Sequence, residues 1–276
     1  MLYFFEKSGI IPLDFLKGEK LMLFVVDIGN TNITLGVFDG EVLKMNARLS
    51  TDKTKTADQY AIEISNVLKI HGIDKASLDG CIVSSVVPSL TAAFKKACEI
   101  LKIKETLFVG PGVKTGLDIK IDNPAQLGAD LAVGAVAAKS KYSLPCVILD
   151  LGTATTISVL DKDGAFLGGQ ICAGLNISLE ALNNKTSQLP GISLDTPKSV
   201  IGRNSIDCMK AGLVIGTACM IDGLIDRIEE ELGQKVSVVA TGGLAGEVIK
   251  NCKRKIELND NLLLDGLREI YFKNKK

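Results

Sequence analysis

The sequence predicts an α/β fold built from two similar lobes, and three observations indicate it. Apolar, β-branched segments of strand length alternate along the chain with longer segments of helical periodicity, a pattern typical of sheets covered by helices. The segment VVDIGNTNITLGVFDG near the N-terminus returns as ILDLGTATTISVLDKDG in the second half. Hydrophobic residues make up 46% of the 276 residues, which is enough for a large core. We therefore expect duplicated lobes and not a short-period repeat.

The elements follow in order from these patterns. Asp39-Gly40 supplies a hairpin turn inside the first copy of the repeat, and Ser89 after Pro88 is a suitable N-cap for the second helix. The expected strands are 23–28, 33–38, 42–49, 80–87, 106–110, 145–151, 155–161, 165–171 and 236–241. The expected helices are 57–71, 89–101, 126–141, 174–184, 207–232, 243–250 and 261–272.

The polar stretch KSKYSLP is the best boundary between the lobes, which we place at residues 22–142 and 143–276. Residues 1–21 fit neither lobe, and their charges and missing cleavage site make a poor signal peptide. Met22 stands immediately before the first expected strand. We expect 1–21 to lie outside the fold and Met22 to be the natural start.

Composition excludes several classes of function. The 32 basic and 32 acidic residues balance, so no net charge favours nucleic acid or an anionic membrane. We find no apolar run approaching the roughly 20 residues that cross a bilayer. The seven cysteines form no C-x-x-C pair and His71 is the single histidine, which argues against disulfides, zinc and a Ser-His-Asp mechanism. A reducing cytoplasm fits this usage best.

The repeated turns have the chemistry of a phosphate site. In each copy an apolar strand ends in Asp-x-Gly, at Asp27 and at Asp150, and a threonine-rich turn follows. The glycine lets the backbone approach a ligand, and the turn amides and hydroxyls can donate to phosphate oxygens. The carboxylate can hold a Mg²⁺ bridged to those phosphates. Two such turns facing each other would clamp a nucleotide.

Other phosphate motifs are absent or ambiguous. GPGVKTG lacks the glycine that must precede Lys114 in a Walker A loop, and no G-x-G-x-x-G opens a helix. The cluster VVATGGLAG could place backbone against a base or ribose, or be an ordinary strand-to-helix turn. Asp130 lies early in an expected helix, where it either complements the helix dipole or serves as a general base. Spacing alone leaves both alternatives open.

A series of motifs, in a fixed order along residues 22–272, decides between the two alternatives for Asp130. The sequence resembles the type III pantothenate kinases, members of the acetate kinase, sugar kinase, Hsp70 and actin superfamily. The motifs are DIGNTNITLG, SSVVPSL, VGPGVKTGL, DNPAQLGAD, LDLGTATT, GGQICAGL, TSQLP, IGRNS and ATGGLA. The resemblance implies a duplicated actin-like (ribonuclease H-like) fold with a nucleotide cleft between its lobes. It also implies ATP-dependent phosphorylation of pantothenate to 4'-phosphopantothenate, the first step of coenzyme A biosynthesis, by a homodimer in the cytoplasm.

The resemblance also implies roles for particular residues. Asp130 matches the family's catalytic proton acceptor, and Asp27 matches a carboxylate that holds Mg²⁺ through phosphate. Asp150 matches the ligand of a monovalent cation, K⁺ or NH₄⁺. The ATP site would comprise Asp27, Ile28, Gly29, Asn30, Thr31, Asn32, Ile33, Thr34 and Thr153. The pantothenate site would comprise Gly128, Ala129, Asp130, Leu131 and, across a dimer interface, Thr186.

Two residues depart from the family pattern. Leu131 stands where the family usually has arginine, and Ile121 where it usually has tyrosine. An arginine in place of Leu131 would pair with the carboxylate of an acidic substrate. Loss of such a charge-assisted hydrogen bond weakens the binding free energy by on the order of 1.5–3 kcal/mol. Besides an active pantothenate kinase, the alternatives are therefore a kinase of the same fold with another substrate and a non-catalytic nucleotide-binding regulator. Intact Asp27, Asp130 and Asp150 argue against the regulator.

Overall fold

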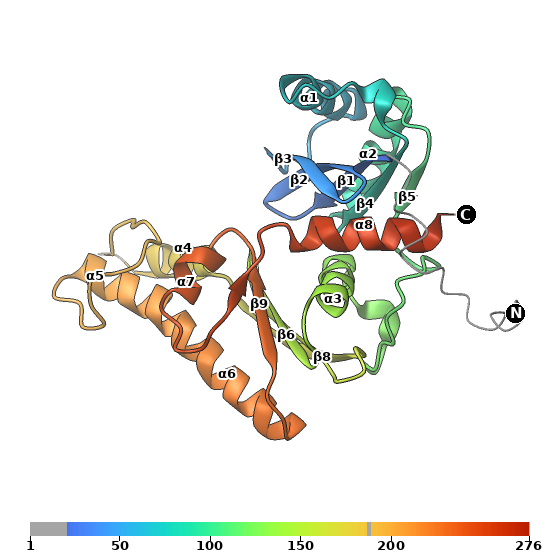
Figure 1. The fold of residues 1–276 in the computed structure, drawn as a ribbon. Coiled ribbons are helices and arrows are strands. Elements are labelled where there is room, and N and C mark those ends of the chain that lie inside the picture. The colour runs from blue at the N-terminus through green and yellow to red at the C-terminus, as the bar shows by residue number, and fades with distance from the viewer. Residues whose placement is uncertain (1–20, 187–188, 276) are drawn as a thin grey trace, which may run out of the picture.

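The structure, a computed structural model, describes residues 21–186 and 189–275 and contains two five-stranded sheets with helices around them (Figure 1). The first sheet has the order β3-β2-β1-β4-β5 and the second the order β10-β9-β6-β7-β8. The strands are β1 (Met22–Ile28), β2 (Asn32–Asp39), β3 (Val42–Ser50), β4 (Gly80–Ser85), β5 (Thr106–Phe108), β6 (Cys146–Leu151), β7 (Ala154–Leu160), β8 (Phe166–Ala173), β9 (Ser237–Thr241) and β10 (Glu257–Leu258).

The two sheets have the same topology, which confirms the duplication that the sequence predicts. In the first, β1, β2 and β3 form an antiparallel meander, and β4 and β5 add parallel to β1. In the second, β6, β7 and β8 form the meander, and β9 and β10 add parallel to β6. The short strand β10 was not predicted.

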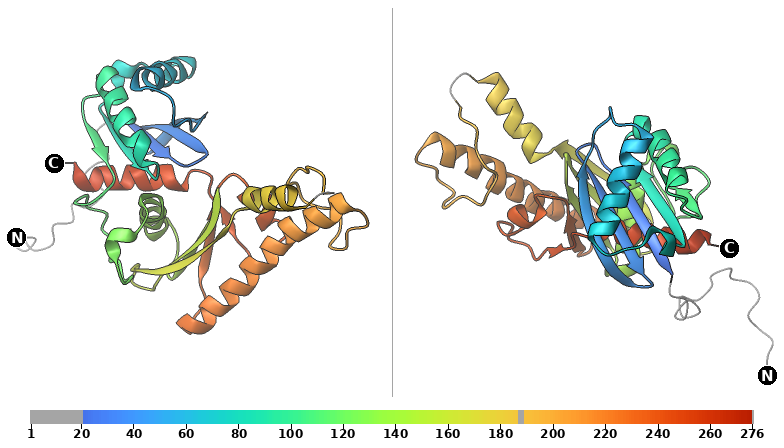
Figure 2. Two further views of the ribbon diagram at one scale, coloured as in Figure 1. Left: turned by 180° about the vertical axis from the view of Figure 1, so that it is seen from behind. Right: turned by 90° about the horizontal axis from the view of Figure 1, so that it is seen from above.

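Helices form three layers around the sheets (Figures 1 and 2). One pair covers the outer face of the first sheet, one pair lies between the sheets, and the rest cover the outer face of the second sheet. In that order they are α1 (Ala57–Ile70), α2 (Pro88–Ile100), α3 (Ala129–Lys141), α8 (Leu262–Asn274), α4 (Leu175–Lys185), α5 (Ser205–Lys210), α6 (Gly216–Leu232) and α7 (Ala245–Ile249). Short 3₁₀ turns at Lys75–Ser77 and Pro124–Gln126 complete the helical elements.

The last helix returns to the first sheet. Leu264 and Leu267 of α8 belong to the apolar cluster that contains Val25 of β1, while α3 contributes to the clusters of both sheets. The lobe boundary at 142/143 stays a prediction. Most of the expected extension, residues 1–20, lies outside the described residues.

One prediction about a helix was wrong, and another needs a refinement. Ser89 is not a cap, because α2 begins at Pro88 and its N-cap is Val87, which makes no side-chain cap bond. The expected helix over 207–232 is interrupted by a π-helical turn at Ala211–Ile215. The whole run Ser205–Leu232 is also long and apolar enough to cross a membrane by length and composition, which the sequence analysis missed; a core helix of a soluble protein passes the same test.

Strand alternation places the two repeated aspartates on inner sheet faces. Along β1, Val26 and Ile28 face the α1–α2 layer while Val25 faces α3 and α8, so Asp27 has the inward side. Along β6, Leu149 and Leu151 face the outer helices and Ile148 faces the inner layer, so Asp150 points inward as well. The same period of two therefore aims both carboxylates at the space between the sheets.

Candidate active site

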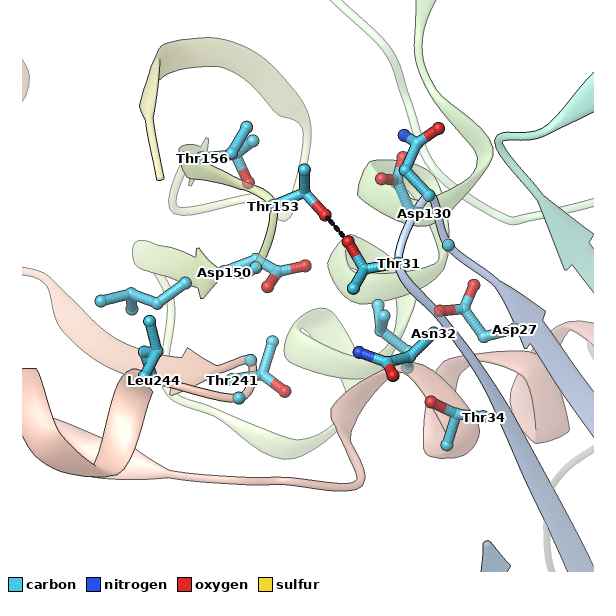
Figure 3. A pocket seen from close by; sticks show the side chains of 18 of the residues that line it. Asp27, Thr31, Asn32, Thr34, Asp130, Asp150, Thr153, Thr156, Thr241 and Leu244 are labelled. Carbon is cyan, nitrogen blue, oxygen red and sulfur yellow. Dashed lines mark hydrogen bonds between the residues drawn. The ribbon is translucent and has the colours of Figure 1, made fainter. Parts of the chain in front are cut away.

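A cleft of about 570 Å³ lies at the ends of both meanders and receives residues from both sheets (Figure 3). Most of its lining comes from the two repeated turns, the start of α3, α4, the loop after β9 and the start of α8. The lining residues include Asp27, Gly29, Asn30, Thr31, Asn32, Thr34, Arg48, Asp130, Asp150, Gly152, Thr153, Thr156, Asn176, Glu180, Thr241, Gly242, Gly243, Leu244 and Asp260.

The two repeated turns face each other across this cleft. Within the first, the Gly29 amide donates to the Asn32 carbonyl at 3.0 Å; within the second, the Gly152 amide donates to the Ala154 carbonyl at 3.1 Å. The hydroxyls of Thr31 and Thr153 lie 2.9 Å apart and join the turns directly (Figure 3). This is the facing arrangement that the sequence predicts for a nucleotide clamp.

Each aspartate sits in a polar row that runs across neighbouring strands. Asp27 pairs with Thr34 of β2 and with Ser84 of β4. Residues paired in register point to the same face of a sheet, so these three side chains are neighbours. Ser84 is fully buried, and its hydroxyl lies beside the Asp27 carboxylate without reaching hydrogen-bond geometry with a described group.

The second sheet repeats this row. Asp150 pairs with Thr156 of β7 and with Thr241 of β9, so a hydroxyl again flanks the carboxylate on each side. All three side chains are seen together in Figure 3. Duplication of the fold thus duplicates a hydroxyl–carboxylate–hydroxyl row on opposite walls of one cleft.

Burial in the cleft disfavours the ionised forms of Asp27, Asp130 and Asp150. Burial, and then repulsion from Asp130 and Asp150, raises the pKa of Asp27 to about 7, although Ser84 acts in the opposite direction. Burial and repulsion from Asp130 raise the pKa of Asp150 to about 6. Burial also raises the pKa of Asp130, against the hydrogen bond that its Oδ1 accepts from the Leu131 amide at 2.8 Å. A cation in the cleft would relieve all three groups.

Asp130 enters the cleft from the first turn of α3, whose N-cap is Gly128. A Cβ at Gly128 would lie 2.6 Å from Oδ1 of Asp130. Any larger residue at 128 would therefore push the Asp130 carboxylate out of its present position. The helix dipole and the Leu131 amide favour the ionised form. The structure thus combines the two alternatives for Asp130, since the side chain is both in the first helical turn and in the cleft.

The third glycine cluster also reaches the cleft. Gly242 has φ +100°, and a Cβ on it would lie 2.7 Å from Oδ1 of Asp150. Gly243 and Leu244 follow it in the lining. The backbone of this turn is therefore exposed to the cleft beside the second repeated aspartate.

Several expected site residues lie elsewhere. The side chains of Ile28 and Ile33 are fully buried in the core of the first lobe, so only their backbone is near the turn. Gly128, Ala129 and Leu131 flank Asp130 but are outside the cleft lining. Thr186 is exposed at the end of α4, where its hydroxyl donates to the Leu182 carbonyl at 2.7 Å.

Other residues in or beside the cleft were missed by the sequence analysis. Thr241 ends β9 and lines the cleft, and Thr156 is paired with Asp150 by register. Ser84, near the end of β4, is buried beside Asp27 and lies behind the cleft lining. The similar endings IVSS and VVAT were a usable signal for Ser84 and Thr241. Nothing in the sequence indicates that Arg48 lines the cleft, because its place depends on the pairing of β3 with β2.

The donor set suits a hard cation. Carboxylate and hydroxyl oxygens are the ligands that Mg²⁺ prefers, and Mg²⁺ keeps several waters and substrate oxygens in its shell. In the described residues no group of three or more histidine, cysteine, aspartate or glutamate side chains could hold a metal ion by itself. The residues therefore fit a metal held partly by the protein and partly by a phosphate ligand.

Comparison with known proteins identifies the family. The family model described as type III pantothenate kinase matches residues 23–227. The type III pantothenate kinase of Exiguobacterium sibiricum is 42% identical over 92% of this chain and 100% of its own length. That of Myxococcus xanthus is 44% identical over 92% of this chain and 99% of its own. The chain belongs to the type III pantothenate kinase family.

Solved structures support the fold of this family member. The putative Baf family transcriptional activator of Campylobacter jejuni aligns with a TM-score of 0.58 at 18% identity, over 91% of this chain and 98% of that one. MreB 5 of Spiroplasma citri, solved with AMPPNP bound, aligns with a TM-score of 0.53 at 10% identity, over 91% and 96%. These likenesses show the two-lobed actin-like fold that the resemblance implied.

Proposed function

We propose that this protein transfers the terminal phosphoryl group of ATP to the primary hydroxyl of pantothenate, giving 4'-phosphopantothenate for coenzyme A synthesis in the cytoplasm. The observation that carries the proposal is the convergence of Asp27, Asp130 and Asp150 on one cleft in a member of this kinase family. A regulator that only bound nucleotide could use Asp27 and Asp150 to hold cations, but it would have no use for a proton acceptor such as Asp130 in the same cleft.

In this mechanism the two facing turns hold the polyphosphate. The hydroxyls of Thr31 and Thr153 can donate to phosphate oxygens once the contact between them opens. Bound magnesium would neutralise phosphate charge, with Asp27 as the residue that holds it through phosphate or water. The turns fix the phosphoryl group in line with the acceptor, which is the main protein contribution to phosphoryl transfer.

Asp130 accepts the proton of the acceptor hydroxyl. Its raised pKa makes it a stronger base than an ordinary carboxylate, and the Leu131 amide keeps it ionised and oriented. General base catalysis of this kind contributes about 10²- to 10⁴-fold. The acceptor must therefore lie between Asp130 and the end of the phosphate chain.

We propose that Asp150 holds a monovalent cation, K⁺ or NH₄⁺. Its carboxylate is flanked by the Thr156 and Thr241 hydroxyls and by the backbone at Gly242, an oxygen-rich setting. A single positive charge there would lower the raised pKa of Asp150 and attract the phosphates.

We also propose a homodimer formed through the outer layer of the second sheet. Exposed apolar side chains gather there, among them Val200 and Ile201, and the latter is 80% exposed. Only 33% of the most apolar window of the Ser205–Leu232 helix is buried. A partner covering this layer would reach the exposed end of α4, which would bring Thr186 to a site on the other subunit.

The test is ADP release by the purified chain with Mg²⁺, K⁺, ATP and pantothenate, compared with the same mixture lacking pantothenate. We expect release that depends on pantothenate. Leu131→Arg, which restores the usual basic residue of the family, should lower the KM for pantothenate. ATP binding without pantothenate-dependent release, in both proteins, would contradict the proposal and leave another acceptor or a regulatory role.

A further inference from the structure

The polar rows of the two sheets continue by one more strand, and there they differ. In the first sheet Thr34 of β2 pairs with Arg48 of β3. In the second sheet Thr156 of β7 pairs with Ile171 of β8. The rows therefore read hydroxyl, aspartate, threonine in both lobes and then end in arginine on one wall and isoleucine on the other.

Arg48 is available to a ligand. It is exposed, it lines the cleft, and its guanidinium has no hydrogen-bond or ion-pair partner within the described part of the chain. Its counterpart Ile171, which is 76% exposed, cannot attract an anion. The duplicated site is thus basic at one end and apolar at the equivalent end.

The charge of the cleft makes this difference important. Arg48 is the one basic residue in the lining of the cleft, as far as the chain is described. The same lining contains five acidic residues, which are Asp27, Asp130, Asp150, Glu180 and Asp260. A polyphosphate entering such a surface is repelled unless cations accompany it, and Arg48 is the cation that the described protein itself supplies.

The position of Arg48 selects a part of the nucleotide. Asp130 and Thr34 lie on opposite sides of Asp27 (Figure 3), and Arg48 is one strand beyond Thr34. Two strand spacings put it roughly 10 Å from Asp27 along the sheet. A phosphate bound there is remote from the base Asp130. We propose that Arg48 binds the inner phosphates of the nucleotide, which ATP and ADP share, and so orients the chain with its terminal phosphate towards Asp130.

This inference rests on the proposed nucleotide site, but it is tested without an acceptor. Dissociation constants for ATP, ADP and AMP, each with Mg²⁺, are measured by calorimetry for the wild-type chain, Arg48→Ala, Arg48→Lys and the control Lys44→Ala. Lys44 is an exposed cation on the same strand and lies outside the cleft lining. Thermal unfolding of each variant checks that it is folded.

We expect Arg48→Ala to weaken ATP and ADP binding by about 10- to 100-fold, the usual effect of losing a hydrogen bond to a charged group. AMP should lose much less, Arg48→Lys should recover part of the affinity, and Lys44→Ala should match the wild type. Unchanged ATP affinity in Arg48→Ala, or an equal loss for all three nucleotides, would overturn the assignment. A raised KM for pantothenate with unchanged ATP binding would overturn it too, because Arg48 would then hold the acceptor's carboxylate. If only the proposed function fails, the wild-type chain will bind ATP normally but will not transfer phosphate to pantothenate, and the effect of Arg48→Ala on ATP binding will remain.

Discussion

Replacing Asp27 with asparagine should stabilise the protein in the absence of ligands while removing its affinity for ATP. Burial, and then repulsion from Asp130, raises the pKa of Asp27 in the folded protein to about 7, against an ordinary value of 3.8. The folded state therefore binds more protons between these values, and stability falls as the pH rises through them. The difference between the two pKa values is 7 − 3.8 = 3.2. Relative to protonated Asp27, it lowers the free energy of unfolding by about 4 kcal/mol well above pH 7 and by about 2 kcal/mol at pH 5.

Urea unfolding at pH 5 and pH 8, without nucleotide or Mg²⁺, measures this effect. Because the cleft can relax and admit water, we expect Asp27→Asn to gain roughly 2–4 kcal/mol at pH 8 and clearly less at pH 5. The control is Asp163→Asn, an exposed aspartate outside the cleft, which should change stability by less than about 0.5 kcal/mol. A loss of stability in Asp27→Asn, or a gain that does not depend on pH, would refute the view that the ionised Asp27 carboxylate destabilises the protein when no cation is bound.

Asp130→Asn should abolish turnover and leave the calorimetric affinity for ATP nearly unchanged; a variant that kept most of its rate would rule out the base. Replacing K⁺ with Na⁺ should raise the KM for ATP if Asp150 holds the cation, and an unchanged KM would count against that site. The Glu229 side chain is 7% exposed, and its hydrogen bonds with Arg254 and Lys235 lower its pKa to about 2, so it adds stability above pH 4.5 that is lost as the pH falls towards 2. Glu229→Gln should therefore cost about 1–3 kcal/mol in urea unfolding at pH 7, with no cost near pH 2. Ile201→Glu should convert a dimer to monomers by light scattering and reduce turnover, and a wild-type chain that is already monomeric would contradict the interface.

The sequence predicted the repeat, most elements and the two aspartate turns, because these depend on local periodicity and on short motifs. It missed what depends on pairing between strands. Arg48 enters the cleft through its register with Thr34, and Ser84 adjoins Asp27 through the parallel pairing of β4 with β1. It also missed the return of α8 to the first sheet, since an amphipathic helix carries no signal of which surface it will cover. Asp130 could be placed early in a helix, but its approach to the other carboxylates is a property of the assembled cleft.

Phosphorylation of pantothenate in this cleft requires Asp130 as the base. The most direct measurement is mass spectrometry of the acceptor after incubation of the wild-type chain and Asp130→Asn with ATP, Mg²⁺, K⁺ and pantothenate. We expect phosphopantothenate with the wild type and none with the variant. Pantothenate recovered unmodified from a wild-type chain that binds ATP, or phosphopantothenate formed equally by both proteins, would contradict it.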